Sequence, residues 1–235
     1  MDKVVVIGDT WRAYRFPENA ANWSSGGSAV EYFRDLSLAN VGKYGAQVQA
    51  LLKKAATLDI SIICPLHGPV LTENLGYYLD KYNVWSSYRP EQEGIVIAYT
   101  SVYGNTKKAV IALESALKER GCPKVIVHDL ARCDMAEAVE DAFRYGKLVL
   151  ATTTYNGDVF PFMREFIEEL LERNYQKKTV GIIENGSWNP MAAKRMRAML
   201  EGAKELTFLE KDVTIHAALT DASREELTRL AEALI

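Results

Sequence analysis

Residues 94 to 106 read Gly-Ile-Val-Ile-Ala-Tyr-Thr-Ser-Val-Tyr-Gly-Asn-Thr, and this stretch decides the fold class of the chain. Ile95 to Tyr99 form an unbroken apolar run of strand length, and an amphipathic helical pattern begins after Thr106. The turn between them is typical of a phosphate site, because the free N–H groups and the dipole of the helix both favour an anion there. We expect the anion to bind at Thr100, Ser101, Val102, Tyr103, Gly104, Asn105 and Thr106.

The spacing within this turn indicates which phosphate it holds. No Lys follows Gly104, although a Walker loop needs one for a nucleoside triphosphate, and the G-x-G-x-x-G pattern of a dinucleotide loop is absent. A monophosphate fits better. The residues resemble the Ser/Thr-x-Thr/Tyr-Gly-Asn-Thr signature of flavodoxins, and this resemblance implies FMN as the cofactor. From the residues alone, the alternative is a hydroxyl-rich helix cap without a ligand.

Downstream of this turn, apolar strands alternate with helical patterns. Five strands interleaved with five helices predict an α/β domain with a doubly wound parallel sheet, which for this resemblance is flavodoxin-like. The expected strands are 95–100, 124–128, 148–152, 179–184 and an irregular fifth formed by 206–209 and 213–216. The expected helices follow Thr106 and cover 135–145, 160–173, 191–202 and 224–234.

Two further loops are predicted at the carboxyl ends of these strands, where a ligand binds in such a sheet. Both combine aromatic, glycine and amide or hydroxyl residues. Tyr155 and Trp188 are the natural rings to stack on a planar isoalloxazine, although loop aromatics can also pack over a sheet edge without a ligand. The cofactor residues expected here are Thr152, Thr153, Thr154, Tyr155, Asn156 and Gly157 in one loop, and Asn185, Gly186, Ser187 and Trp188 in the other.

The polar, Pro-containing segment from Arg89 to Gly94 separates two regions with different sequence patterns, because strands and helices alternate regularly only after it. We therefore expect a flavodoxin-like FMN-binding domain at residues 94–235 and a separate region at residues 1–90. The first region offers two strands (3–7 and 60–65) and helices within 28–57 and 72–86. So few strands could hardly enclose a large core, so the region reads as part of a larger domain.

The order of motifs resembles the flavodiiron proteins, also called A-type flavoproteins. It runs from Leu66-His67-Gly68-Pro69 through Trp85-Ser86-Ser87-Tyr88 to the flavodoxin-like region. Members of that family couple a metallo-β-lactamase-like diiron domain to an FMN domain and reduce O2 or NO. The resemblance implies that residues 1–90 are the C-terminal remnant of a metallo-β-lactamase-like α/β domain. It also makes His67 and Asp9 the positions that match iron ligands of the family.

The family's His-rich ligand cluster is missing from this chain. The sequence holds only three histidines, His67, His128 and His216, and a diiron centre needs several imidazoles together with carboxylates. We therefore expect no metal site in this chain, with Asp9 and His67 as vestigial candidates, unless a separate chain supplies the other ligands. No catalytic side chain is expected either, because the flavin carries the redox chemistry.

These observations predict an FMN-binding electron-transfer flavoprotein that resembles the flavin half of a flavodiiron O2 or NO reductase. One alternative is an NAD(P)H-dependent flavin or quinone reductase, which would share the fold and the phosphate turn. Another is a subunit that docks a separate diiron-bearing partner. The resemblance implies a redox protein donor such as rubredoxin, and a homodimer.

Composition excludes other classes of function. Lys and Arg total 28 against 31 Asp and Glu, and the basic residues are not clustered, which argues against a nucleic-acid partner. The longest apolar runs are far shorter than a membrane span, and the N-terminus lacks a signal-peptide pattern. We expect a soluble, cytoplasmic protein. Its three cysteines, Cys64, Cys122 and Cys133, form no C-x-x-C pair and read as reduced, structural thiols.

Overall fold

The computed structural model describes residues 4–7, 42–65 and 70–235. The chain divides into two compact units, Met1–Arg89 and Pro90–Ile235. In the first unit, β1 (Val4–Ile7) pairs in parallel with β2 (Ile62–Pro65). The described part of this unit also holds a 3-10 turn, η2 (Gly42–Tyr44), and two helices, α2 (Gly45–Ala55) and α3 (Leu75–Ser86). Both strands were expected from the sequence, and both lie within the predicted ranges.

Helices α2 and α3 are joined by one polar side chain. The Gln49 amide of α2 donates hydrogen bonds of 2.9 Å to Asn83 Oδ1 and to Ser86 Oγ, both on α3. Val48 and Trp85 are buried in this unit. The vestigial metal candidates Asp9 and His67 lie outside the described residues.

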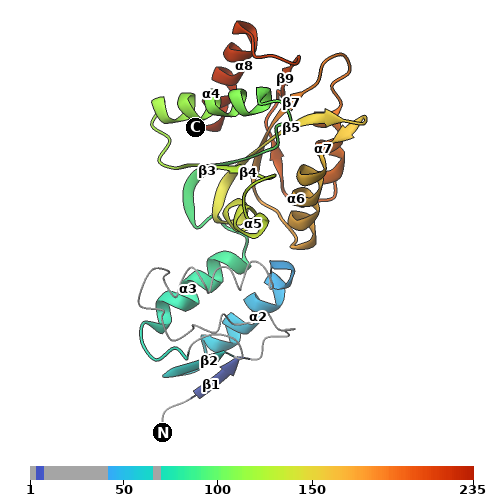
Figure 1. Cartoon of the computed structure of the whole chain (residues 1–235). Coiled ribbons are helices and arrows are strands. Elements are labelled where there is room, and N and C mark those ends of the chain that lie inside the picture. The colour runs from blue at the N-terminus through green and yellow to red at the C-terminus, as the bar shows by residue number, and fades with distance from the viewer. Residues whose placement is uncertain (1–3, 8–41, 66–69) are drawn as a thin grey trace. The chain divides into compact units, whose positions relative to one another are not determined.

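The second unit alternates strands and helices along its whole length (Figure 1). Two neighbouring parallel strands must be joined by a crossover connection, which is usually a helix packed on the sheet. Apolar strands and amphipathic helices therefore follow each other along the chain. In chain order the elements are β3 (Gln92–Tyr99), α4 (Asn105–Glu119), β4 (Val125–Asp129), α5 (Met135–Arg144), β5 (Tyr145–Tyr155), β6 (Asp158–Val159), α6 (Pro161–Glu172), β7 (Thr179–Asn185), α7 (Ala192–Leu200), β8 (Thr207–Phe208), β9 (Val213–Ile215) and α8 (Asp221–Leu234).

The strand order is β4-β3-β5-β7-β8, with every neighbouring pair on this path parallel. The predicted fifth strand is split into β8 and β9, which both pair in parallel with β7. The chain therefore winds from β3 outward to β4 and then back across to β5. This confirms the predicted doubly wound parallel sheet, with its topological switch point between β3 and β5.

Two helices, α4 and α8, cover one face of this sheet, and α5, α6 and α7 cover the other (Figure 1). Strand residues alternate between the two faces. Ile95, Ile97, Val149 and Ile183 face α4 and α8, where they join Leu113 in a core with almost no exposed surface. Burying a side chain of this size stabilises the fold by about 1.5–3 kcal/mol, so this layer fixes the sheet that carries the loops at its carboxyl edge.

The third predicted strand is longer than expected and ends in a hairpin. The sequence predicted a loop from Thr152 to Pro161, but β5 runs to Tyr155 and pairs antiparallel with β6. Asn156 and Gly157 form the turn, with φ angles of 50° and 71°. An Asn-Gly pair favours this two-residue turn, and the Thr and Tyr residues before it are good strand formers, which explains the difference.

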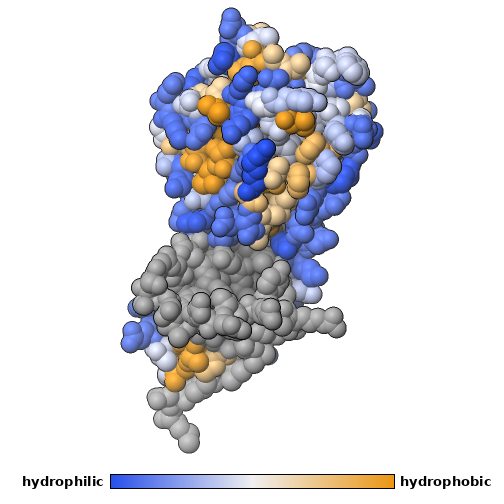
Figure 2. Space-filling model, in the orientation of Figure 1, coloured by the Kyte–Doolittle hydropathy of each residue, from blue (hydrophilic) through white to orange (hydrophobic). Residues whose placement is uncertain are grey.

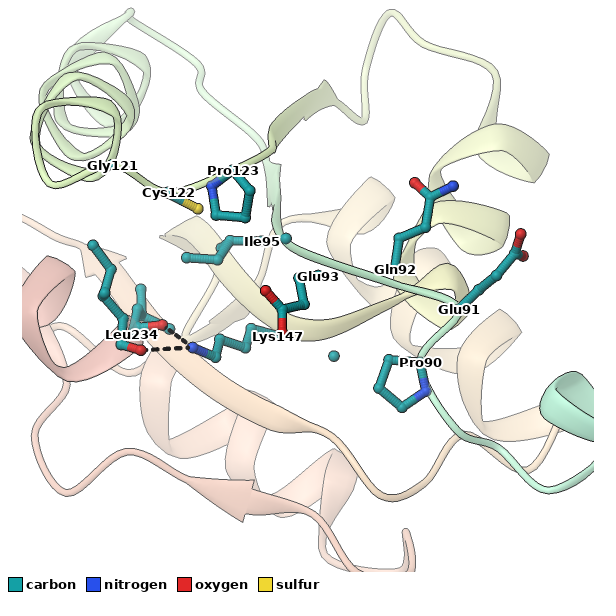
Figure 3. A pocket seen from close by; sticks show the side chains of 13 residues that line it. Pro90, Glu91, Gln92, Glu93, Ile95, Gly121, Cys122, Pro123, Lys147 and Leu234 are labelled. Atoms are coloured by element: carbon teal, nitrogen blue, oxygen red, sulfur yellow. Dashed lines mark hydrogen bonds between the residues drawn. The ribbon is translucent and has the colours of Figure 1, made fainter.

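A cavity of about 460 Å³ opens at the opposite, amino edge of the sheet (Figure 3). Pro90 and Gly146 contribute to its wall, and the Lys147 ammonium group donates to the backbone carbonyl of Leu234 and, at 3.3 Å, to that of Ile235. None of the cofactor residues expected from the sequence lines this cavity. The cavity is therefore separate from the loops at the carboxyl edge.

A buried lysine directly precedes β7, toward the amino edge of the sheet. Lys178 is only 2% exposed, and its Nζ donates to the carbonyl of Phe143 at 2.7 Å. The Tyr175 ring packs edge-on against the Phe143 ring, with centroids 5.1 Å apart. Burial without a neighbouring carboxylate lowers the pKa of Lys178 to about 7. This group should make stability depend on pH.

Hydrophilic side chains cover most of the visible face of the second unit, with smaller hydrophobic patches between them (Figure 2). Across the described residues, none of the helices combines the length and the apolar character needed to cross a membrane. The three cysteines Cys64, Cys122 and Cys133 are free, as the sequence predicted.

Candidate functional site

The first turn of α4 is only partly capped. Gly104 is its N-cap residue, with a φ of 84°, and offers no side chain to accept a hydrogen bond from the helix. Ser101 Oγ accepts from the backbone N–H of Lys107 at 3.2 Å, so its hydroxyl proton remains available as a donor. The N–H groups of Asn105 and Thr106 precede the first intrahelical hydrogen bond and point out of the helix end. Together these groups form a set of donors around the dipole's positive end.

Three other helices of the second unit begin differently. Asp134 Oδ1 accepts from the second residue of α5 at 2.9 Å, and Thr220 and Ser223 form a capping box on α8. The first residue of α6 is Pro161, which has no N–H to satisfy. At each of these helix starts, at least one backbone N–H of the first turn already has an acceptor or is missing, so fewer donors remain for an anion.

The start of α7 is closed by side chains from neighbouring strands. Thr154 Oγ1, on β5, accepts from the N–H groups of Met191 and Ala192 at 2.9 and 3.2 Å. Glu184 Oε2, on β7, accepts from the N–H of Ala193 at 2.9 Å. Because a carboxylate already occupies this helix end, α7 would repel a second anion. Among the helices of residues 90–235, α4 is therefore the one whose start has neither an acidic side chain nor a proline, which favours an anion there.

Two hydroxyls near this turn are buried and have no hydrogen-bond partner. They are Thr106 Oγ1, in the first turn of α4, and Thr153 Oγ1, near the end of β5. By strand alternation Thr153 lies on the same face of the sheet as Ala151, which packs in the core beneath α4. Arg144 Nε, Arg173 Nε and the Tyr175 hydroxyl also lack a partner elsewhere in the second unit, so it is the position of the two threonines at the carboxyl edge that favours a ligand-binding role there.

Thr100 and Thr152 behave differently, although both were expected to bind the cofactor. Their hydroxyls share a hydrogen bond of 2.6 Å, and both residues are fully buried. These side chains therefore link the ends of β3 and β5. This hydrogen bond uses one of the two hydroxyl protons, so the other hydroxyl keeps a proton that it can donate.

Exposed aromatic side chains lie at the same edge of the sheet as the first turn of α4. Tyr103 in the loop after β3 is 91% exposed, and Trp188 in the loop after β7 is 92% exposed. Tyr155, at the end of β5, is 46% exposed and packs edge-on against Phe160. Because β5 lies between β3 and β7 in the sheet, the three loops share one edge. Large exposed rings on loops of one sheet edge are typical of a binding surface.

The loop after β7 is fixed at its base and free at its tip. Asn185 Nδ2 donates to the carbonyl of Ala217 at 3.2 Å, and the N–H of Gly186 donates to that of Ile215 at 3.0 Å. Ser187 and Trp188 are exposed beyond these anchors. Asn185 thus holds the loop to the segment after β9, while Ser187 and Trp188 are available to a ligand.

Two titratable groups at this edge stay protonated at neutral pH. The Tyr99 hydroxyl donates to Asp129 Oδ2 at 3.1 Å, and burial together with this carboxylate raises the pKa of Tyr99 to about 12. Burial also raises the pKa of the Cys133 thiol. Tyr99 therefore remains a donor that joins β3 to β4, and Cys133 is a poor nucleophile.

A model of the flavodoxin domain matches residues 96–213, about half of the chain. The chain belongs to the flavodoxin-domain family. Its flavodoxin domain comprises the strands and loops just described and implies FMN as the cofactor.

Individual proteins similar to this chain include members of the flavodiiron proteins. The chain is 27% identical over 184 residues to an uncharacterised protein of Methanocaldococcus jannaschii, covering 77% of this chain and 44% of the relative. It is 25% identical over 148 residues to the anaerobic nitric oxide reductase flavorubredoxin of Escherichia coli, covering 62% of this chain and 30% of that protein. The rubredoxin oxygen:oxidoreductase of Desulfovibrio gigas superposes with a TM-score of 0.80 at 19% identity, covering 87% of this chain and 51% of that chain.

This chain thus spans less than half the length of the curated relatives it matches. At such identity the likeness to the solved structures shows a shared fold. The chain is an FMN-type flavoprotein related to the C-terminal part of the flavodiiron proteins, as the sequence motifs predicted.

The residues present suit FMN. The partly capped start of α4 and the unpartnered hydroxyl of Thr106 provide donors for a phosphate, and the exposed rings of Tyr155 and Trp188 provide faces for a planar ring system. Among the described residues, no three His, Cys, Asp or Glu side chains gather as a metal site would require.

Two contributions to this site had weak or no sequence signals. The Asn156-Gly157 hairpin has a weak sequence signal, which is the Asn-Gly pair between strand-forming residues. The contact of Arg195 with Gly157, made from α7, has no sequence signal, because a helix and two strands separate the two residues along the chain.

Proposed function

We propose that this chain is an FMN-binding electron-transfer protein that resembles the flavin half of a flavodiiron O2 or NO reductase. The observation that carries the proposal is the partly capped first turn of α4, with the buried, unpartnered hydroxyl of Thr106 beside it. Bound FMN would supply one- and two-electron chemistry, and the protein would bind, orient and tune it.

Separate groups of residues would hold the two ends of the cofactor. Ser101, Asn105, Thr106 and the main chain around Gly104 would donate to the phosphate. The β5–β6 hairpin would line one side of the ring with Thr153, Tyr155, Asn156 and Gly157. Ser187 and Trp188 would line the other side, with Asn185 and Gly186 fixing the base of that loop.

The proposal includes no diiron centre in this chain. His128 Nε2 lies 2.8 Å from Asp141 Oδ2, so it is already paired within the flavodoxin domain, and His216 is exposed just after β9. The sequence contains one other histidine, His67. Three histidines so distributed are too few for two irons.

Residues 1–90 would be a metallo-β-lactamase-like remnant, and a redox protein would supply electrons. The names of two similar proteins support a redox protein as the donor, because one is a flavorubredoxin and the other a rubredoxin oxygen:oxidoreductase. A donor such as rubredoxin is therefore part of the proposal, and so is a homodimer, which rests on the resemblance to the flavodiiron proteins alone.

Comparing FMN with riboflavin tests the phosphate site directly. We expect FMN to bind one per chain, and about a hundredfold more tightly than riboflavin, because several charge-assisted hydrogen bonds are lost with the phosphate. Quenching of flavin fluorescence during titration of the apoprotein gives both affinities. Equal affinities would contradict the phosphate site, and two irons per chain in the purified protein would contradict the metal-free part.

The same sample separates a carrier from a reductase. A carrier should keep its yellow colour when NADH or NADPH is added alone and should bleach when a reduced redox protein is supplied. Rapid bleaching by NAD(P)H alone would instead support the flavin reductase alternative.

Gly104→Ala should weaken FMN binding through the backbone. The φ of 84° disfavours a side chain, and a Cβ would enter the space that the phosphate needs, although nothing lies within 4 Å of it in the protein itself. We expect a stability loss of about 1–2 kcal/mol and FMN affinity about tenfold lower. Gly121→Ala is the matched control, because Gly121 has a φ of 79° and equally open surroundings at the far end of α4. The control should lose stability alone, and an equal loss of FMN affinity in both variants would contradict the prediction.

A further inference from the structure

The β5–β6 hairpin is held from outside by two arginines on successive helices. Arg164, on α6, forms an ion pair with Asp158 Oδ2, while Asp158 Oδ1 accepts from the N–H of Val159 at 2.8 Å. Arg195, on α7, donates from Nε to the carbonyl of Gly157 at 3.3 Å. One contact holds the side chain after the turn, and the other holds the main chain of the turn itself.

The placement of Arg195 follows from the way α7 is attached to β5. Thr154 accepts from the N–H groups of Met191 and Ala192, which fixes the first turn of α7 beside the end of β5. Arg195 is one helical turn further along α7, and Gly157 is three residues beyond Thr154. The helix and the hairpin therefore run alongside each other, and Arg195 reaches the turn from a fixed base.

Gly157 is the residue of the hairpin with the least intrinsic restraint. Its φ is 71°, and it has no side chain to limit rotation of the peptide that follows. The carbonyl held by Arg195 belongs to that peptide, between Gly157 and Asp158. Because Tyr155 pairs with Asp158 across the turn, the direction of this peptide also fixes the end of β5.

We propose that Arg195 is a positioning residue that orders the hairpin turn for the isoalloxazine ring. This inference rests on the proposed function for its ligand, because the same hairpin would line one side of the ring. Arg195 would act through the Gly157 carbonyl, with its Nε–H as the donor, and its guanidinium charge would be secondary.

Side-chain replacements can separate the donor from the charge. Arg195→Met keeps a chain of similar length but has no donor at the position of Nε. Arg195→Gln places an uncharged amide nitrogen at the same number of bonds from the backbone as Nε. Lys194→Met, at the preceding exposed position of α7, removes a charge that makes no contact with the hairpin and serves as the control.

Amide hydrogen exchange in the apoprotein measures the ordering without any cofactor. We expect residues 156–159 to exchange about fivefold faster in Arg195→Met, which corresponds to the loss of one hydrogen bond, and at the wild-type rate in Arg195→Gln and Lys194→Met. Wild-type exchange in Arg195→Met would overturn the proposal. So would equally fast exchange in Arg195→Gln, because the charge and not the donor would then be responsible.

Flavin affinity provides the second readout. Arg195→Met should weaken FMN and riboflavin by the same factor, about fivefold, because the hairpin contacts the ring and not the phosphate. Arg195→Gln should restore both affinities. If the wild-type protein binds neither flavin, the proposed function fails while the exchange result still stands. If it binds both and Arg195→Met changes neither, the role of Arg195 toward the ring is wrong while the proposed function stands.

Discussion

Thr106→Val is expected to stabilise the protein without its cofactor while weakening the binding of FMN. The Thr106 hydroxyl is buried and has no partner, so replacing it with a methyl group of the same shape removes an unsatisfied polar atom. The gain should be about 1–2 kcal/mol in the free energy of unfolding. Because the phosphate would lose a donor, FMN affinity should fall by about tenfold or more, with riboflavin affinity unchanged. Chemical denaturation of the apoprotein and flavin titration give the two quantities.

Thr100→Val is the matched comparison, because it makes the same chemical change with the opposite effect on stability. The Thr100 hydroxyl is bonded to that of Thr152 inside the protein, so its loss leaves a buried partner unsatisfied. We expect a loss of about 1–3 kcal/mol. If both variants lost stability to the same extent, the Thr106 hydroxyl would have a partner within the protein, and the argument for a ligand at this position would fail.

Lys178→Met should remove the pH dependence of stability that the buried lysine imposes. The pKa of Lys178 is about 7 in the folded protein and 10.5 when the side chain is free, so between these values the unfolded chain binds more protons. Stability of the wild-type protein should therefore rise with pH across this window, by up to about 1.4 kcal/mol per unit from this group. Below pH 7 the charged form is buried at a cost, and methionine has no such cost.

We expect the variant to be more stable than the wild type at pH 7, with the difference shrinking by about 3–4 kcal/mol between pH 7 and pH 10. At the upper end the variant should be the weaker protein, since the carbonyl of Phe143 has lost its donor. Denaturant titrations at several pH values measure the difference in the free energy of unfolding between variant and wild type. The titration of all other groups is common to both proteins and cancels in this difference. Lys211→Met, at an exposed site, is the control for the loss of a lysine side chain without burial. A constant difference for Lys178→Met would show that the lysine is charged inside the fold.

Much of this fold could be predicted because local and global signals agree. The strands β3, β5 and β7 are apolar on both faces, which is the pattern of a parallel sheet covered by helices, and the order of elements then leaves few topologies. The turn that we propose for the phosphate could be located from its residue types, because a helix start and a glycine at a positive φ both have sequence signals.

Details that depend on pairing between distant segments could not be predicted. The sequence indicates threonines at 100 and 152, but only the register of β3 against β5 brings their two hydroxyls within hydrogen-bond distance of each other. In the same way, no sequence pattern indicates that the Thr154 hydroxyl accepts from the N–H of Met191 at the start of α7, 37 residues away along the chain. Short polar side chains have many possible partners, and tertiary contacts decide among them.

The way α7 begins has a consequence for the order of folding. This helix has no cap from its own segment and receives its acceptors from Thr154 and Glu184, which lie on two different strands. Helices of this length are marginal in water when isolated, so its first turn should form only after the two strands have paired. The Trp188 side of the ring site would then be completed late in folding, and a nascent chain would acquire its phosphate turn before it could enclose the flavin.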